Sequence, residues 1–179
     1  MGIFRQRKRG GGRIVVLVDY ENIIQNTPVD PRAESPTKKI VQLIEEIKRT
    51  TGRVIGVFVF VPRYLAPPYE MFFWEQEFFP ILCPKIRIAG EETDTSDETL
   101  IKFGKEVVFQ FRDLTHLCLL SGDADFLPLL KLCRNRGLEI MVAASTIQSL
   151  AKDLIKVASV NPDTKKRRIS ILYPNPTQS

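Results

Sequence analysis

The sequence is poor in the side chains that many catalytic sites need. Its 179 residues include one histidine, His116, and three cysteines, none of them in a CxxC pair. His116 precedes a buried apolar run, far along that strand from the acidic residues described below. Neither a histidine general base nor a Ser-His-Asp or Cys-His arrangement can therefore be assembled. The cysteines lie mostly within apolar runs, which predicts small buried side chains in a reducing compartment.

Long hydrophobic runs are also absent. No stretch approaches the roughly 20 apolar residues that a membrane helix needs. Residues 1–13 are basic, and the first apolar run, 14–18, ends where Asp19 interrupts it, which argues against a secretory signal. We therefore expect a cytoplasmic protein without membrane contact. A hydrophobic fraction of 44% at this length is that of one ordinary globular domain with its own core.

The net charge of +5 is unevenly distributed along the chain. Basic residues cluster near both ends: Arg5, Arg7, Lys8, Arg9 and Arg13, then Lys165, Lys166, Arg167 and Arg168. The segment between them, 14–160, keeps 17 basic and 20 acidic residues, a net charge of −3. Basic clusters attract polyanions by releasing condensed counterions, so we expect both ends to contact RNA. The plainer alternative is that they only solubilise the protein.

The pattern of apolar residues predicts a flexible basic arm at 1–12, a folded domain at 13–160 and a basic tail at 161–179. Within the domain, strands are expected at 13–19, 54–61, 85–89, 115–121 and 138–144, and helices at 37–50, 95–112, 126–135 and 146–158. A short aromatic-rich helix should follow Pro67-Pro68, and 169–173 could add an edge strand. Alternating strands and helices predict an α/β, Rossmann-like parallel sheet of about five strands with helices on both faces.

The aromatic residues of the segment 72–79 have two interpretations. They are Phe72, Phe73, Trp74, Phe78 and Phe79. Aromatic side chains can stack on nucleic-acid bases. Clustered apolar residues on a helix more often pack in a core or an interface, which is the prediction we adopt.

Acidic residues follow the predicted strands where a parallel sheet binds its ligands. Asp19 ends the first strand, and Asp123 follows the fourth through Ser121-Gly122. Ligands bind beyond the carboxyl ends of such strands, where the strand order reverses. Asp97 lies three residues before Leu100 on the apolar face of the predicted helix 95–112, so it should point toward the same corner.

Two further acids complete the set. Asp94 lies just before the helix 95–112, and Asp125 follows Asp123 by two residues. Gathered carboxylates repel one another unless a cation lies between them, and hard oxygen ligands suit Mg²⁺ or Mn²⁺. The candidate metal ligands are Asp19, Asp94, Asp97 and Asp123. Each acid also has a structural alternative: Asp125 could cap the helix 126–135, and Asp94 or Thr95 the helix 95–112.

Neighbouring polar and basic residues are candidates for substrate contact. Asn22 lies three residues after Asp19 and could orient it or a phosphate, and Ser121 offers a hydroxyl beside Asp123. Both could equally be turn residues. Arg63, Lys85 and Arg87 lie near predicted strand ends and could line a path for single-stranded RNA, although each could also be an ordinary surface charge.

Three sequence elements together resemble the signatures of the NYN domain, a LabA-like member of the PIN-like nuclease superfamily. They are Val16-Leu17-Val18-Asp19-Tyr20-Glu21-Asn22, Thr93-Asp94, and Ser121-Gly122-Asp123-Ala124-Asp125-Phe126-Leu127-Pro128-Leu129, and the similarity spans about 13–145. The resemblance implies a Rossmann-like fold and Mg²⁺- or Mn²⁺-dependent cleavage of RNA. It also implies that Asp19, Asp94, Asp123 and Asp125 form the catalytic acidic set with Asn22 as the associated amide.

One departure from that family pattern affects the functional prediction. Members often have Lys-Gly-Val before the second acid, whereas this chain has Glu91-Glu92-Thr93. The primary prediction is a metal-dependent ribonuclease, which could also form a homodimer. The alternative is a catalytically weak or inactive RNA-binding module on the same fold. A haloacid-dehalogenase-like phosphatase is a weaker candidate, because Glu21 stands where that chemistry needs a shorter acid.

Overall fold

The computed structural model describes residues 12–26, 36–65, 70–88, 90–146, 148–157 and 169–172. Its main sheet has six strands in the order β3-β2-β1-β6-β7-β8, and every neighbouring pair is parallel. The strands are β1 (Gly12–Asp19), β2 (Gly52–Pro62), β3 (Phe79–Cys83), β6 (His116–Leu120), β7 (Glu139–Ala143) and β8 (Ile169–Leu172). The predicted α/β fold with a parallel sheet is confirmed, and the edge strand foreseen at 169–173 is present as β8.

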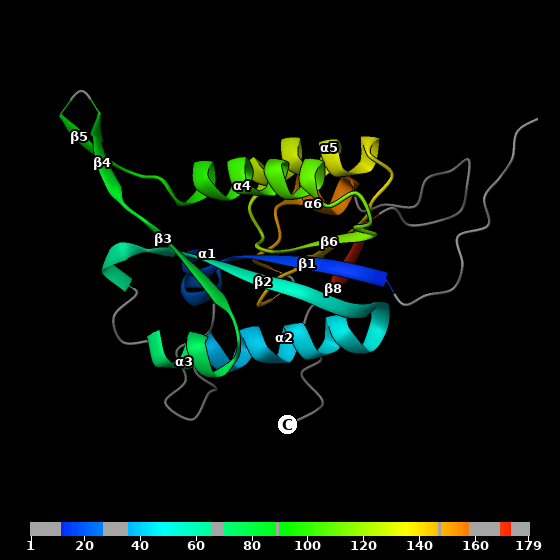
Figure 1. The fold of residues 1–179 in the computed structure, drawn as a ribbon. Helices are drawn as coiled ribbons and strands as arrows, with labels where there is room; N and C mark the ends of the chain where they lie inside the picture. Colours follow the sequence, from blue (N-terminus) through cyan, green and yellow to red (C-terminus); the bar gives the residue numbers. More distant parts are fainter. Residues whose placement is uncertain are drawn as a thin grey trace, which may run out of the picture.

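Helices cover both faces of this sheet, as Figure 1 shows. One face carries α4 (Ser96–Gln110), α5 (Leu127–Asn135) and α6 (Lys152–Val157); the other carries α1 (Tyr20–Gln25), α2 (Pro36–Thr51) and α3 (Glu70–Glu75). Successive side chains of β1 point to opposite faces of the sheet, which explains why helices pack on both faces. Val15 and Leu17 pack under α4 and α5, whereas Val16 and Val18 pack against α1 and α2.

The prediction of a sheet strand at 85–89 is wrong. The sheet strand of this region is β3, which pairs with β2, and Lys85–Ile88 is instead β4 of an antiparallel hairpin with β5 (Glu91–Asp94). β3 contains Pro80, and because β3 is the outermost described strand on its side of the sheet, it tolerates a proline. The hairpin projects beyond the sheet in Figure 1.

The prediction of one helix over 146–158 is also wrong. The described helix, α6, begins only at Lys152. Before it, the hydroxyl of Thr146 accepts the Ser149 amide at 3.2 Å, and the Ser149 hydroxyl donates to the Thr146 carbonyl at 2.7 Å. Such side-chain bonds to nearby backbone compete with helix formation and hold a turn instead.

The aromatic segment 72–79 is divided between helix and strand. The helix α3 ends at Glu75, and Phe79 opens β3. Phe73 and Phe78 are buried, as a core role requires, but Trp74 and Phe79 keep 75% and 56% of their surface exposed. The core prediction therefore holds for part of the segment. Cys83, Cys118 and Cys133 are all buried and unpaired, as expected.

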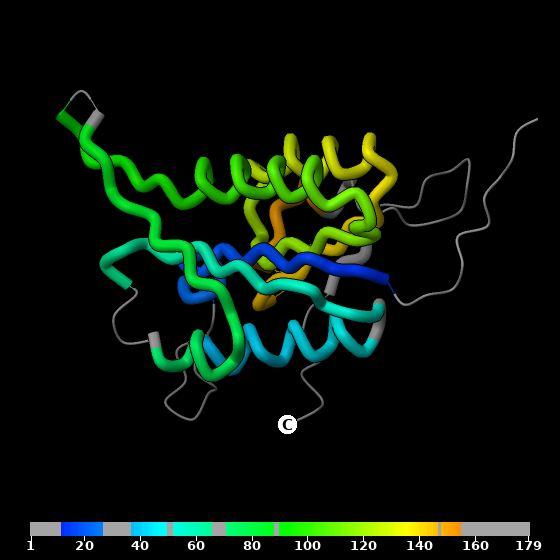
Figure 2. Tube along the Cα trace, in the orientation of Figure 1, coloured from blue at the N-terminus to red at the C-terminus, as the bar shows by residue number. Residues whose placement is uncertain are grey.

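The strand order reverses between β1 and β6. From β1 the chain adds β2 and β3 on one side, then returns through α4 to add β6, β7 and β8 on the other side. Figure 2 traces this path as a continuous tube. The carboxyl ends of β1 and β6 therefore meet at one corner beside the start of α4, where a doubly wound sheet binds its ligands.

Candidate metal centre

Three aspartates from two parts of the chain meet at this corner. Asp97 lies in the first turn of α4, and Asp123 and Asp125 lie just after β6, at the 3-10 helix η3 (Ala124–Phe126). One carboxylate oxygen from each residue lies within 4.8 Å of the other two. Asp97 and Asp125 are exposed and Asp123 is half-buried, so an ion could reach all three from solvent.

Asp19 lies behind this cluster at the end of β1 and is only 6% exposed. Its Oδ1 accepts a hydrogen bond from the backbone N–H of Asn22 at 3.1 Å, and its Oδ2 accepts one from the Ser121 hydroxyl at 2.9 Å. Burial raises the pKa of Asp19 to about 7, and the charges of Asp97 and Asp123 add to that rise, whereas the two hydrogen bonds oppose it. The ionised form is therefore poorly stabilised by the protein alone.

The pKa of Asp97 is also raised, first by burial and then by four surrounding acids. In decreasing order of effect these are Asp123, Asp125, Asp94 and Glu21. The corner thus concentrates negative charge from β1, α1, β5, α4 and the loop after β6. A divalent cation would relieve this repulsion, and the donors are all carboxylate oxygens of the kind that Mg²⁺ and Mn²⁺ prefer.

The loop Ser121-Gly122-Asp123 is held in place by polar contacts from both sides. The Gly122 amide donates to Asn22 Oδ1 at 3.1 Å, and the Asp123 amide donates to the Ser121 hydroxyl at 3.2 Å. A side chain at position 122 would not fit, because its Cβ would lie 1.8 Å from the carbonyl oxygen of Ser149. Glycine at this position lets the loop after β6 lie directly against the turn before α6.

The hydrogen bonds at the starts of the helices differ in part from the caps that the sequence suggested. Asp123, not Asp125, caps the first turn after β6, because its Oδ1 accepts the Asp125 amide at 2.9 Å. The N-cap position of α4 is Thr95, but the first helical amide is bound by the residue before it, since Asp94 Oδ1 accepts the Ser96 amide at 2.7 Å. The Thr95 hydroxyl donates to the Pro84 carbonyl instead, which ties the base of the hairpin to the start of α4.

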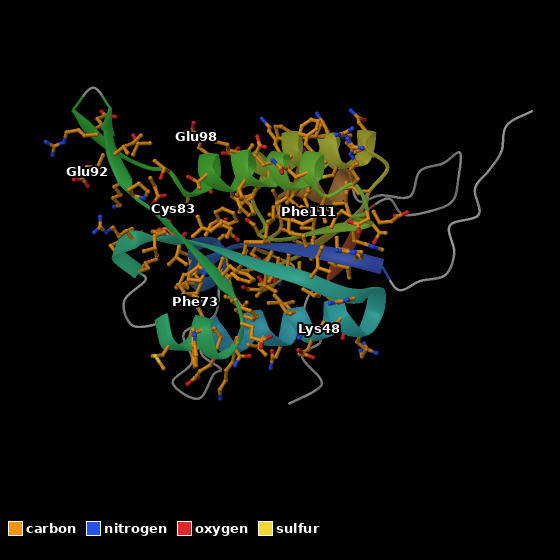
Figure 3. The ribbon with its side chains drawn as sticks, viewed as in Figure 1. Lys48, Phe73, Cys83, Glu92, Glu98 and Phe111 are labelled. Carbon is orange, nitrogen blue, oxygen red and sulfur yellow. The ribbon has the colours of Figure 1, made fainter. Side chains whose placement is uncertain are left out.

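The structure places the predicted substrate residues in two different environments. The Ser121 hydroxyl and the Asn22 amide oxygen are engaged inside the site by Asp19 and Gly122. Arg63, Lys85 and Arg87 are exposed, the first in the 3-10 turn η1 (Arg63–Leu65) and the others on β4. Figure 3 labels Glu92 in this hairpin, Cys83 at the end of β3 and Glu98 in the first turn of α4.

Two residues at this corner, Tyr64 and Glu21, were not proposed as site residues in the sequence analysis. Tyr64 in η1 donates its hydroxyl to Glu21 Oε1 at 2.7 Å, and the Lys85 ammonium lies 4.6 Å from the centroid of the Tyr64 ring. Glu21 lies two residues after Asp19, so its place near the site could have been predicted. No local pattern around Tyr64 indicates its position, because its contact with Glu21 spans 43 residues of sequence.

The family comparison decides the assignment of this fold and site. The family model described as "NYN domain" matches residues 13–161. The chain belongs to the NYN domain family. The resemblance inferred from the three sequence elements is thereby confirmed, and with it the placement in the PIN-like superfamily.

Solved structures similar to this NYN domain are distant from it. The nicotinamidase SaPncA from Staphylococcus aureus is 16% identical, with 87% of this chain and 90% of that chain covered and a TM-score of 0.34. The N-carbamoylsarcosine amidase from Thermoplasma acidophilum is 14% identical, with 94% and 99% covered and a TM-score of 0.35. The comparison with curated proteins found no match to this chain. Among the described residues, no helix is long and apolar enough to cross a membrane.

Proposed function

We propose that this NYN domain is a ribonuclease that needs Mg²⁺ or Mn²⁺ to hydrolyse phosphodiester bonds in single-stranded RNA. The observation that carries the proposal is the meeting of Asp97, Asp123 and Asp125 within 4.8 Å, next to the buried Asp19. Family membership supports a nuclease fold, and the carboxylate cluster supplies the ligands that such an activity needs.

The donor set fits a hard divalent ion. We assign Asp97, Asp123 and Asp125, whose oxygens meet, as the centre of its ligand set, and the other predicted acids, Asp19 and Asp94, as the carboxylates that complete it. All offer oxygen, and the single histidine lies at the opposite end of β6, so nitrogen ligation is unavailable at this corner. When bound, the ion would supply positive charge to polarise a phosphate and to favour the ionisation of water.

The residues of the chain have separate tasks in this proposal. The Ser121 hydroxyl and the backbone N–H of Asn22 fix the orientation of Asp19. The side-chain oxygen of Asn22 accepts the Gly122 amide and so holds the loop that carries Asp123. Asp94, which accepts the first amide of α4, contributes negative charge at the mouth of the site. The high pKa of Asp19 means that it competes for a proton near neutral pH whenever no cation is bound.

Contact with RNA is assigned to basic groups around the acidic corner. Arg63, Lys85 and Arg87 are exposed near it. The clusters at 5–13 and 165–168 are proposed to add charge, and Arg13 is the one member within the described residues. Arg13 lies at the start of β1, at the opposite end from Asp19, and forms an ion pair with Asp113 at 2.6 Å. Cytoplasmic location stays a prediction, and no observation on the described part of the chain supports a homodimer.

A non-catalytic RNA-binding module is the second candidate. One observation favours it: both carboxylate oxygens of Asp19 already accept hydrogen bonds from the protein. The exposed Glu91 and Glu92 on β5 add negative charge where family members often have a cation. Such a module would bind RNA without cutting it.

Cleavage of end-labelled single-stranded RNA in Mn²⁺ separates the two candidates. The nuclease predicts cleavage that EDTA abolishes and that Asp123→Asn lowers by about 100-fold or more, the upper range for loss of a partner at a metal site. Asp113→Asn is the matched control, because it makes the same chemical change at an exposed acid that pairs with Arg13. Equal cleavage by both variants would refute the assigned site, and binding without cleavage in wild type would establish the module.

A further inference from the structure

Tyr64 is an exposed aromatic ring whose position is fixed at its hydroxyl end. It follows β2 at the carboxyl edge of the sheet and keeps 53% of its surface exposed. Its hydroxyl donates to Glu21 Oε1 at 2.7 Å, and this bond is the largest cause of the rise in the pKa of Tyr64 to about 12. Because the ring is held but not buried, it presents an ordered flat surface to solvent.

A cation lies against the same ring. The Lys85 ammonium is 4.6 Å from the Tyr64 centroid, within the range of a cation–π contact. Lys85 opens β4 and is the cross-strand partner of Asp94. The ammonium lies over the ring, but over half of the Tyr64 surface is still exposed and open to a ligand. An aromatic surface and a positive charge are therefore presented together.

This pair adjoins the acidic corner. The charge of Asp94 contributes to the raised pKa of Tyr64, and the charge of Glu21, which holds Tyr64, contributes to the raised pKa of Asp97. Tyr64 and Lys85 thus lie at the mouth of the site rather than elsewhere on the surface. A polyanion at this corner would find Lys85 as a counter-charge beside the acids, because Lys85 is the cross-strand partner of Asp94.

We propose that Tyr64 is a stacking platform for one unpaired base of the RNA, and that Lys85 binds the backbone phosphate beside it. The inference rests on the proposed ribonuclease function and adds the recognition of its substrate. Proteins that bind single strands combine a positive path for the backbone with aromatic rings for successive bases. Stacking is tolerant of base identity, so Tyr64 selects single strands over duplexes without reading sequence.

The preference for single strands follows from the geometry of the bases. In a duplex both faces of each base are covered by its neighbours, so a protein ring can reach a base only at an end or after unstacking. An unpaired base is free to leave its neighbours and lie on Tyr64. Loss of the ring should therefore weaken the binding of single-stranded RNA and leave duplex binding unchanged.

The test uses the full chain and short single-stranded RNAs that carry one 2-aminopurine, whose fluorescence falls on stacking. Tyr64→Ala should weaken binding about tenfold and abolish the loss of fluorescence. Tyr64→Phe keeps the ring without the hydroxyl and should retain most of both signals. Phe111→Ala is the matched control, because Phe111 is an exposed aromatic at the opposite end of α4 from the site (Figure 3).

The outcomes separate this inference from the proposed function. If wild type cleaves RNA and Tyr64→Ala does so with unchanged KM and kcat, the stacking proposal is overturned and the nuclease stands. If Tyr64→Phe loses as much as Tyr64→Ala, the hydroxyl matters rather than the ring, which also overturns it. If RNA is bound with Tyr64-dependent quenching but never cut, stacking is supported and the nuclease fails. Absence of RNA binding by wild type would refute both.

Discussion

Asp19 combines two properties that conflict in the absence of a cation. Burial at the end of β1 disfavours its charge, while hydrogen bonds from the Ser121 hydroxyl and the Asn22 amide favour it. Burial wins, because the pKa is raised to about 7. A residue that is only partly ionised near neutral pH suits a ligand whose proton is displaced by a metal ion.

The pH dependence of stability follows from this shift. The pKa of Asp19 rises from 3.8 in the unfolded chain to about 7 in the folded one, so the folded state holds an extra proton between these values. Stability without metal therefore falls as pH rises through this window, by up to about 4 kcal/mol. Asp19→Asn has no charge to desolvate and should be more stable than wild type at about pH 8 but not at about pH 4. Urea unfolding in EDTA measures the stability of both proteins at both pH values. A larger stabilisation by Asp19→Asn at the lower pH would contradict the raised pKa of Asp19.

The hydroxyl of Ser121 lowers the pKa of Asp19 by donating a hydrogen bond to its carboxylate. Ser121→Ala removes a hydrogen bond to the carboxylate, worth about 1.5–3 kcal/mol when the acceptor is charged. The pKa of Asp19 should rise further, so the acid limb of the pH–activity profile should move up by about one unit. Ser145→Ala is the control, because it removes another buried hydroxyl, one that donates to the Ile23 carbonyl. It should lower stability without moving the acid limb.

Local patterns in the sequence were sufficient for β1 and α4, two of the elements that carry the acids. The run 14–18 is apolar at every position, so β1 and the exit at Asp19 could be predicted, and the spacing of Leu100, Val107 and Val108 predicted α4. The hairpin β4–β5 could not, because the alternation Lys85-Ile86-Arg87-Ile88 also fits a strand of the main sheet and Glu91–Asp94 is polar at every position. Tyr64 reached the site through a contact with Glu21 that no local pattern encodes.

The loop after β6 makes a strict steric demand at Gly122. A Cβ there would lie 1.8 Å from the Ser149 carbonyl oxygen, so the loop or its neighbour must move. Gly122→Ala should destabilise the fold by about 1–3 kcal/mol, as overpacking does, and should displace Asp123 from Asp97. RNA cleavage should therefore fall by more than the loss of folded protein explains, which unfolding curves and activity measured side by side will show.

Gly137→Ala controls for backbone strain at a glycine. Gly137 has φ +76° and open space around it, and it lies just beyond α5. This variant should lose stability because alanine resists positive φ, but its activity per folded molecule should match wild type. If Gly122→Ala also keeps full activity per folded molecule, the position of the loop does not set the geometry of the acids.

The sheet order explains why residues about a hundred positions apart become one site. Crossing from β2 and β3 to β6 reverses the strand order at β1, and this reversal brings Asp19 and the loop after β6 to one corner. The alternation of strands and helices predicted that corner without coordinates. It could not predict that Asp97, Asp123 and Asp125 form the tight group while Asp19 lies behind it, because that depends on burial and on the hydrogen bonds of Ser121.

An acidic corner on a folded body should make stability of the whole chain depend on a divalent ion. An ion that binds only the folded state stabilises it by about 2.7 kcal/mol when present at 100 times its Kd. Mn²⁺ should therefore raise the Tm of wild type and of Asp113→Asn, and should raise that of Asp123→Asn little or not at all. Because protons compete for Asp19 and Asp97, the rise should shrink as pH falls below about 7. Differential scanning calorimetry at two pH values tests both statements, and equal stabilisation of Asp123→Asn and wild type would place the ion elsewhere on the molecule.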